Sequence, residues 1–164
     1  MLTWGQFAAE QPDLVETGRA LLYRVGLGLG YLATVRADGG PRVHPVCPIL
    51  TDDGLYLFVV SSPKRADLRR DPRYALHAFP SDGNEDAFYV TGTAEPRPDP
   101  ALREQLAEQY LVVERKIPEP PPGFADEQLF ELLIDACLAT KTTGYGDWNP
   151  QHTVWKSGRE RGRG

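Results

Sequence analysis

Short apolar runs separated by turns rich in Gly, Asp and Pro are the dominant pattern of this sequence. Runs of this length that contain β-branched and aromatic residues predict strands, and the polar turns between them predict antiparallel connections. The expected strands are residues 31–37, 42–50, 55–60, 74–79, 88–94, 129–140 and 153–155. The turn Asp38-Gly39-Gly40 joins the first two strands into a hairpin.

One of these runs, residues 129–140, fits two periodicities. It alternates with a period of two, which predicts a strand, but the same run is also compatible with a helix. The strand interpretation places five apolar residues on one face: Phe130, Leu132, Ile134, Ala136 and Leu138.

Helical patterns occupy the N-terminus and the region before a proline-rich loop. Residues 3–24 predict one or two short helices, with Thr3 as the first cap. Residues 98–110 predict another helix, capped by Asp99. Residues 117–123 (IPEPPPG) predict a surface loop, because proline cannot continue a regular element.

Length and composition predict one globular domain over residues 1–164, with N-terminal helices in 1–26 and a flexible tail in 156–164. Hydrophobic residues make up 41% of the chain and charged residues 25%, which is ordinary for a soluble protein. No apolar run is long enough to span a bilayer, and the N-terminus has no leader pattern, so we expect a cytoplasmic protein without a membrane partner. The net charge of −5 argues against nucleic acid as a partner. Cys47 and Cys137 stand alone in apolar surroundings, so we expect free, buried thiols and no metal site.

The segment 55–73, LYLFVVSSPKRADLRRDPR, is the strongest indication of function. An apolar strand ends at a Ser-Ser-Pro corner, and five basic residues follow against only two aspartates. The first N–H groups of a helix have no intrahelical acceptor, and the helix dipole favours an anion at this end. The pattern therefore predicts a site for a phosphorylated small molecule.

Four segments in this order resemble the pyridoxamine 5′-phosphate oxidase-like family of flavin-binding split β-barrels. They are the N-terminal helix, GYLATVRADGGPRVHPVCPI, LYLFVVSSPKRADLRRDPRYAL and VTGTAEP, and they span the central part of the chain. The resemblance implies a mainly β protein with small helices, folded as a six-stranded Greek-key split β-barrel and assembled as a homodimer. It also implies FMN, or in some branches F420 or haem and less often FAD, in two grooves at the dimer interface.

The resemblance assigns cofactor contacts by position. It implies that Lys64, two residues after the corner serine Ser62, binds the phosphate, and that Val60 and Ser61 border it. It implies that the strand after the first hairpin lines the ribityl chain and the ring edge, through Arg42, Val43, His44, Pro45 and Val46. Two further candidates are Arg65, which adjoins Lys64, and Trp155, which with His152 could close over the flavin ring.

The sequence departs from the family's vitamin B6 oxidases at two places. Pro63 precedes Lys64, where those enzymes carry an Arg-Lys pair, and the C-terminal HTVWKSGRERGRG lacks their Arg-x-His motif. We therefore do not expect vitamin B6 phosphate oxidase activity.

Several candidates also have a structural explanation. Arg42 fits an edge-strand charge as well as a phosphate contact. His44, on a strand expected to be buried, fits a cofactor-lining residue better than a proton donor. Tyr145 and Trp148 are candidates for a substrate lid, although a surface loop without function also explains them. Three arginines later on the helix are expected to pair with its aspartates, Asp67 and Asp71: Arg69, Arg70 and Arg73.

The function that fits these observations is an FMN-binding oxidoreductase, in which hydride passes from a reduced nicotinamide to a small organic acceptor. No nucleophile motif is present, and the catalytic side chains stay unassigned, because the flavin ring itself carries the electrons. One alternative is an F420-dependent reductase on the same fold. Another is a non-catalytic flavin- or haem-binding sensor or stress protein.

Overall fold

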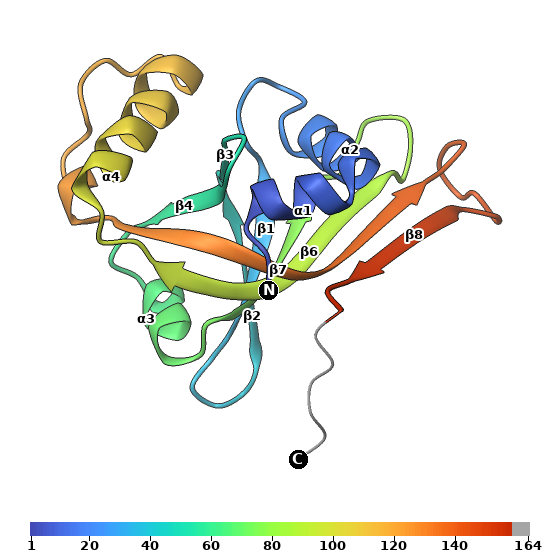
Figure 1. The fold of residues 1–164 in the computed structure, drawn as a ribbon, viewed down its shortest axis with the longest axis horizontal. Helices are drawn as coiled ribbons and strands as arrows, with labels where there is room; N and C mark the ends of the chain where they lie inside the picture. Colours follow the sequence, from blue (N-terminus) through green and yellow to red (C-terminus); the bar gives the residue numbers. More distant parts are fainter. Residues whose placement is uncertain (159–164) are drawn as a thin grey trace.

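The computed structural model describes residues 1–158 (Figure 1). The helices are α1 (Trp4–Glu10), α2 (Pro12–Leu22), α3 (Pro63–Arg70) and α4 (Pro100–Ala107), with a π-helical turn η1 (Glu108–Glu114) and a 3-10 turn η2 (Phe124–Asp126). The strands are β1 (Gly30–Val35), β2 (Pro41–Val46), β3 (Ile49–Leu50), β4 (Leu55–Val59), β5 (Arg73–Ala78), β6 (Ala87–Pro96), β7 (Gln128–Lys141) and β8 (Gln151–Lys156).

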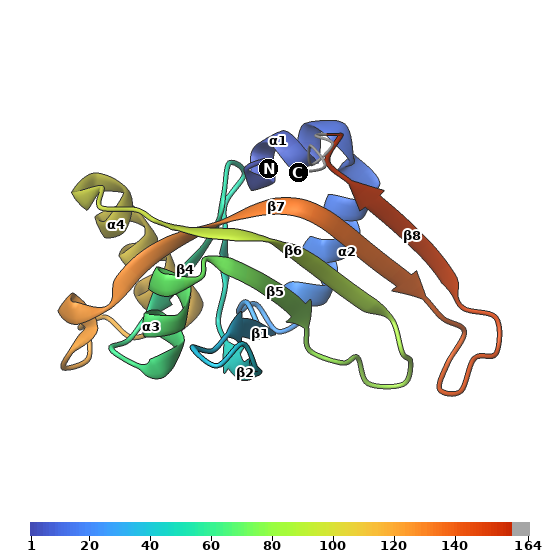
Figure 2. The ribbon, with the colours of Figure 1, turned by 90° about the horizontal axis from the view of Figure 1, so that it is seen from below.

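All strand pairs are antiparallel, in the order β2-β1-β5-β6-β7-β4-β3. The two end strands β2 and β3 follow each other in the chain, so the sheet curls into a half-barrel (Figure 2). Strand β7 is long enough to pair with β4 at its start and with β8 at its end. The expected split β-barrel class is therefore confirmed, with eight strands among the described residues where the pattern predicts seven and the resemblance implies six.

The expected strand 42–50 is divided into β2 and β3. Cys47 and Pro48 interrupt it, because a proline has no N–H to donate to a ladder. The helix expected over residues 98–110 is also divided, into α4 and the π-helical turn η1. Asp99 caps α4 as expected, with its carboxylate accepting hydrogen bonds from two backbone amides.

A β-bulge changes which side chains of β7 face the core. The register against β6 shifts between Thr91 and Gly92, and Asp135 is the extra residue. Before the bulge, the buried side chains are those of Phe130, Leu132 and Ile134. After it, Cys137 is buried, whereas Ala136 and Leu138 are only half-buried. The strand was predicted correctly, but placing Ala136 and Leu138 on the same face as Phe130, Leu132 and Ile134 was wrong, because a bulge inserts one residue into a period of two.

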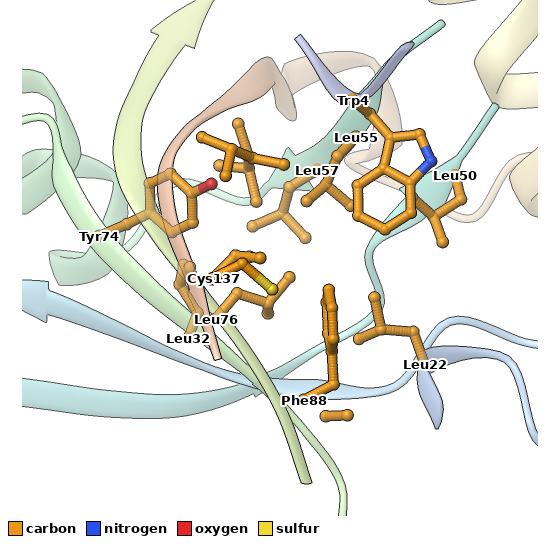
Figure 3. Close-up of a cluster of buried hydrophobic side chains, with 14 of the residues drawn as sticks. Trp4, Leu22, Leu32, Leu50, Leu55, Leu57, Tyr74, Leu76, Phe88 and Cys137 are labelled. Atoms are coloured by element: carbon orange, nitrogen blue, oxygen red, sulfur yellow. The ribbon is translucent and has the colours of Figure 1, made fainter. Parts of the chain in front are cut away.

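The core lies between the curled sheet and the two N-terminal helices (Figure 3). Trp4, Phe7 and Phe88 are fully buried, and the rings of Trp4 and Phe88 meet edge to face at 6.2 Å. A smaller cluster joins α4 and η1 to β3 and β4, and its aromatic members include Phe58 and Phe124, whose ring centres are 4.9 Å apart. The N-terminal helices thus cover one end of the barrel and α4 covers the other.

The described chain ends on β8. Lys156 is the last strand residue and the Ser157 amide donates to the Asp135 carbonyl, so residues 156 and 157 of the expected tail are bound to the sheet. Residues 159–164 of that prediction lie outside the described residues. No helix within residues 1–158 combines the length and apolar character required to cross a membrane.

Candidate functional site at the start of helix α3

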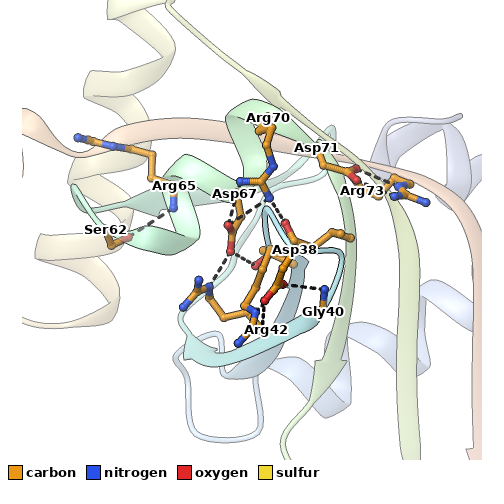
Figure 4. A network of polar contacts seen from close by, with 12 residues as sticks. Asp38, Gly40, Arg42, Ser62, Arg65, Asp67, Arg70, Asp71 and Arg73 are labelled. Carbon is orange, nitrogen blue, oxygen red and sulfur yellow. Dashed lines mark hydrogen bonds and ion pairs between the residues drawn. The ribbon is translucent and has the colours of Figure 1, made fainter.

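The corner between β4 and α3 is built as the sequence predicts. All five residues of β4 are buried, and the chain emerges at the exposed residues Val60 and Ser61. The Ser62 hydroxyl caps α3: it accepts from the Arg65 amide at 3.5 Å and donates to the Val60 carbonyl at 3.0 Å (Figure 4). Pro63 occupies the first helical turn, where its missing N–H costs nothing. The corner is therefore a fixed backbone feature that presents the first turn of α3.

Lys64 lies half-buried in this first turn and makes no ion pair within 4.0 Å in the described part of the chain. Burial lowers the pKa of Lys64, and the Glu127 carboxylate opposes this shift with a smaller effect. A partly desolvated cation without a close partner is unfavourable. An anionic group bound beside Lys64 would remove that cost.

Arg65 is already engaged within the protein. Its guanidinium donates to the Asp126 carbonyl at 2.7 Å and so ties α3 to η2. The Arg65 side chain is half-buried in this position. Of the two neighbouring cations, Lys64 is thus the one left to meet a ligand.

Arg42 connects the edge strand to α3 through a buried carboxylate (Figure 4). Its Nε lies 2.6 Å from Oδ2 of Asp67, and the Asp67 side chain is only 4% exposed. Thr34 and Arg70 also donate to Asp67. Burial raises the pKa of Asp67, but the hydrogen bonds from Arg42, Thr34 and Arg70 outweigh it and hold the pKa below its usual range. The Nε of Arg42 therefore has a structural role, because it pairs with the buried Asp67 carboxylate.

Of the three arginines expected to pair with Asp67 and Asp71, Arg70 on α3 and Arg73 at the start of β5 do so, whereas Arg69 forms no ion pair within residues 1–158. Arg70 pairs with Asp67, and Arg73 pairs with Asp71 through two hydrogen bonds of 2.9 and 2.6 Å. Arg69 is exposed on the same helix. Cations in the last helical turn also complement the helix dipole.

Strand β2 presents two different faces. Val43 and Pro45 are exposed, whereas Arg42 and His44 are half-buried and Val46 is buried. The expectation that His44 lies on a buried strand was wrong, because β2 is an edge strand of the sheet. The half-buried face nevertheless runs beside α3, because Arg42 contacts Asp67 there. Cys47, which follows the strand, is close enough to Lys64 to influence the pKa of Lys64.

Trp155 is separated from this corner within one chain. Its ring packs on Phe7 at 4.8 Å, and its strand position is opposite Cys137. The end of β4, where the corner begins, is opposite Gln128 on the same strand β7. Nine residues of strand separate these positions by roughly 30 Å. His152 pairs with Thr140 near the far end of β8, with 2.9 Å between Nδ1 and Oγ1.

A cluster that the sequence analysis did not single out adjoins Lys64. The Arg115 guanidinium donates to Sγ of Cys47 at 3.2 Å and lies over the Tyr110 ring at 4.7 Å. Burial raises the pKa of Tyr110 to about 12, and burial likewise raises the pKa of Glu127. Cys47 is half-buried rather than buried as expected. No periodicity in the sequence reveals the π-helical turn that brings Tyr110 and Arg115 here.

Two clefts of the described structure lie away from this corner. One cavity of about 600 Å³ separates α1 from α4 and contains the buried Glu131 with its partner Arg97. Another, of about 530 Å³, lies between α2 and the end of β7. Neither of these two spaces includes Lys64.

Comparison with known families agrees with this architecture. Residues 24–141 match the family model of pyridoxamine 5′-phosphate oxidase. The chain belongs to this family. The match contains the first hairpin, the α3 corner and all of β7, so it covers the part of the sheet that positions Lys64.

Three solved structures illustrate the relationship. An F420 reductase shares 28% identity with a TM-score of 0.57, over 73% of this chain and 94% of the other. General Stress Protein 26 from Bacillus anthracis str. Sterne shares 23% identity with a TM-score of 0.57, over 76% and 91%. A heme binding protein from Mycobacterium smegmatis shares 18% identity with a TM-score of 0.60, over 84% and 57%. None of the curated proteins compared matches the sequence.

Proposed function

We propose that this protein is a flavin-dependent oxidoreductase that holds the phosphate of FMN at the start of α3. The single observation that carries the proposal is Lys64: a half-buried cation in a first helical turn, with its pKa lowered by burial and with no ion-pair partner in residues 1–158. Family membership supports a flavin as the class of ligand, and the position of Lys64 supports the start of α3 as its phosphate site.

The residues at the corner fit a phosphate. Lys64 offers an ammonium and its backbone N–H, whereas Pro63 has no N–H and the Arg65 amide donates to the Ser62 hydroxyl. Arg42 adds a second cation beside α3, with its Nε held by Asp67. Cations outnumber carboxylates at this corner, so the negative charge of a phosphate would be attracted to it.

The ring of the cofactor requires a flat, apolar surface beside the phosphate. Val43 and Pro45 expose apolar side chains on β2, with Val43 59% exposed, although they lie on the face of the strand opposite Arg42. The flavin ring, when bound, supplies the hydride chemistry. The chain's own contribution is to bind the phosphate, orient the ring along β2 and exclude water. The second substrate is proposed only as a small organic acceptor.

A second copy of the chain is part of this proposal. A row of cross-strand neighbours on the outer face of the sheet is largely apolar: Pro45, Tyr31, His77, Tyr89, Leu138 and Val154. Tyr31 is 41% exposed although its ring stacks on Phe79, and Val154 is 61% exposed. An apolar strip of this kind favours association with a self-complementary surface.

F420 is the second candidate cofactor, and two observations favour it. The F420 reductase shares more sequence with this chain than the other two structures compared. In addition, Arg115 and Lys116 end the π-helical turn near Cys47 and Lys64, where they could meet a long acidic tail. The haem-binding and stress-protein alternatives rest on similarity of fold alone.

The absorbance spectrum of the freshly purified protein tests the proposal. We expect a flavin spectrum, with FMN released on denaturation, or a spectrum that appears on adding FMN. A deazaflavin spectrum would move the proposal to F420. A Soret band, or the failure of both FMN and F420 to bind at micromolar concentration, would refute it.

A further inference from the structure

The space of about 600 Å³ between α1 and α4, here called the α1–α4 cleft, has fixed walls. Residues of α1, of the turn before β4 and of the segment that leads into α4 line it. The Gly5 amide donates to the Asp53 carbonyl at 2.9 Å, which ties α1 to the turn. The Arg97 amide donates to the Leu129 carbonyl at 2.9 Å, which ties the opposite wall to β7. These backbone bonds hold the two walls apart without a ligand.

Two buried polar side chains from neighbouring strands also line the cleft. Tyr56 on β4 and Glu131 on β7 are direct cross-strand partners, and they are only 6% and 2% exposed. The Glu131 carboxylate accepts from the Arg97 guanidinium through Oε2. Its other oxygen, Oε1, makes no hydrogen bond within residues 1–158. One acceptor of a buried carboxylate is therefore left for a ligand.

The Tyr56 hydroxyl is the second group without a hydrogen-bond partner among the described residues. It lies at the turn before β4, since a Cβ on Gly54 would be 2.3 Å from Oη. Burial raises the pKa of Tyr56, and the charges of three cleft residues also act on this pKa: Glu131, Arg97 and Asp53. The hydroxyl therefore faces the cleft. A phenylalanine would pack equally well here, and an unpaired hydroxyl on a buried side chain is unfavourable.

The charges around the cleft favour a cation. Three carboxylates line it, on Asp53, Asp99 and Glu131, against the single guanidinium of Arg97. The charge of Arg97 is already offset by Glu131, and Asp99 caps α4. Asp53 is exposed and forms no ion pair within the described part of the chain. An anion would meet this excess of negative charge, whereas a cation is attracted by it.

Apolar side chains complete the cleft. Ala9 lines it from α1, and Pro98 and Leu102 line it from the opposite wall. An ammonium group at Oε1 of Glu131 and the Tyr56 hydroxyl would donate to both oxygens, and its hydrocarbon stem would contact the apolar side chains. The open polar atoms and the apolar wall thus match two parts of one kind of molecule.

We propose that the α1–α4 cleft is a second ligand site, which binds a small organic cation that carries a primary ammonium group on a hydrocarbon stem. Glu131 and Tyr56 are its binding residues, and Asp53 adds negative charge. The site is separate from the proposed cofactor site, because Lys64 and its neighbours at the corner do not line the cleft. It stands or fails independently of FMN binding.

NMR titration of the full chain with three probes tests the charge of the ligand. Butylamine, which is protonated at neutral pH, is compared with butanol and butyrate, which have similar stems. We expect butylamine to bind with roughly millimolar affinity, as suits a molecule of this size, and to shift the amide signals of Gly5, Asp53 and Arg97. Butanol and butyrate should bind at least about tenfold more weakly. No binding of butylamine, equal binding of butanol, or signals that shift mainly at other carboxylates would overturn the inference.

Removal of one hydroxyl tests the binding residue. Tyr56→Phe deletes only the phenolic oxygen, and Tyr89→Phe makes the same change on β6, outside the cleft. We expect Tyr56→Phe to weaken butylamine binding about three- to tenfold and to leave the thermal midpoint unchanged or higher, because no hydrogen bond within the protein is lost. Tyr89→Phe should bind butylamine like wild type. Unchanged affinity in Tyr56→Phe, or a lower thermal midpoint of this variant, would overturn the inference.

Neutralising one of two adjacent aspartates tests where the charge acts. Asp53→Asn removes a carboxylate that lines the cleft, whereas Asp52→Asn removes one that pairs with Arg19 at 3.5 Å outside it. At about 0.15 M salt, which screens exposed charges beyond about 8 Å, we expect Asp53→Asn to weaken butylamine binding about two- to threefold. Asp52→Asn should have no effect. Equal effects of the two changes would indicate general attraction to an acidic turn and would overturn the inference.

Discussion

Nε of Arg42 lies 2.6 Å from Oδ2 of Asp67, which joins the edge strand β2 to helix α3. The Asp67 carboxylate is almost fully buried, and Arg70 holds its other oxygen. The pair fixes the distance between the strand proposed to line the ring and the helix proposed to bind the phosphate. A structural charge pair thus determines the width of the proposed cofactor groove.

Replacing Asp67 should destabilise the fold. Asp67→Asn weakens charge-assisted hydrogen bonds from three donors at a buried site, and we expect the free energy of unfolding to fall by about 1.5–3 kcal/mol. Urea denaturation at neutral pH measures the change. Asp38→Asn is the control, since the Asp38–Arg36 pair is exposed and should contribute little. Similar stability of the two variants would contradict the role given to Asp67.

The same pair makes stability depend on pH. The pKa of Asp67 is lower in the folded state than its ordinary value, so its stabilisation is complete above the unfolded pKa of about 3.9 and declines as the pH falls below it. Asp67→Asn should therefore remove part of the stability loss on acidification below about pH 4. Denaturation midpoints measured from pH 6 to pH 3 check this. Identical slopes in wild type and variant would contradict it.

The two cysteines should differ in reactivity. Cys137 is buried in the core, and burial raises its pKa to about 12, whereas Cys47 is half-buried at the surface. The thiolate is the reactive form, so Cys137 should resist iodoacetamide in the folded protein at pH 8 while Cys47 reacts. Mass spectrometry of the labelled peptides, with Cys47→Ser as control, measures this. Labelling of Cys137 without unfolding would contradict the position of the bulge in β7.

Gly92 should tolerate no side chain. A Cβ at this position would lie 1.7 Å from the Leu133 carbonyl oxygen, because the bulge brings the two backbones together. We expect Gly92→Ala to cost about 2–4 kcal/mol or to prevent folding. Gly158→Ala is the control, since no atom lies within 4 Å of the place that its methyl group would take. Thermal denaturation that shows equal midpoints would contradict the bulge.

Much of the fold follows from local pattern. The alternation along β7, the turn at Gly39 and the Ser62 cap each have a short-range cause, and the structure agrees with them. The bulge at Asp135 has no such cause, because it depends on the register of β7 against β6. The expected face of Ala136 and Leu138 was wrong for that reason.

The candidate site likewise has one part that the local sequence predicts and one part that depends on tertiary packing. The strand, the corner and Lys64 are contiguous in sequence, so the corner could be predicted. The neighbours of Lys64 come from the π-helical turn and from the start of β7, and only tertiary packing brings Arg115 and Glu127 to it. The separation of Trp155 from the corner along β7 likewise follows from strand pairing, which the sequence pattern does not give.

The central claim is that Lys64 holds the phosphate of the cofactor, and the affinity of the Lys64→Ala variant for FMN tests it most directly. Fluorescence titration should show affinity lower by about ten- to a hundredfold, because one charge-assisted contact is lost, while Lys156→Ala on β8 binds like wild type. Wild-type affinity should also fall at alkaline pH as Lys64, whose pKa is already lowered by burial, loses its proton, and the variant should lack this decline. Equal FMN affinity in wild type and Lys64→Ala would contradict the account.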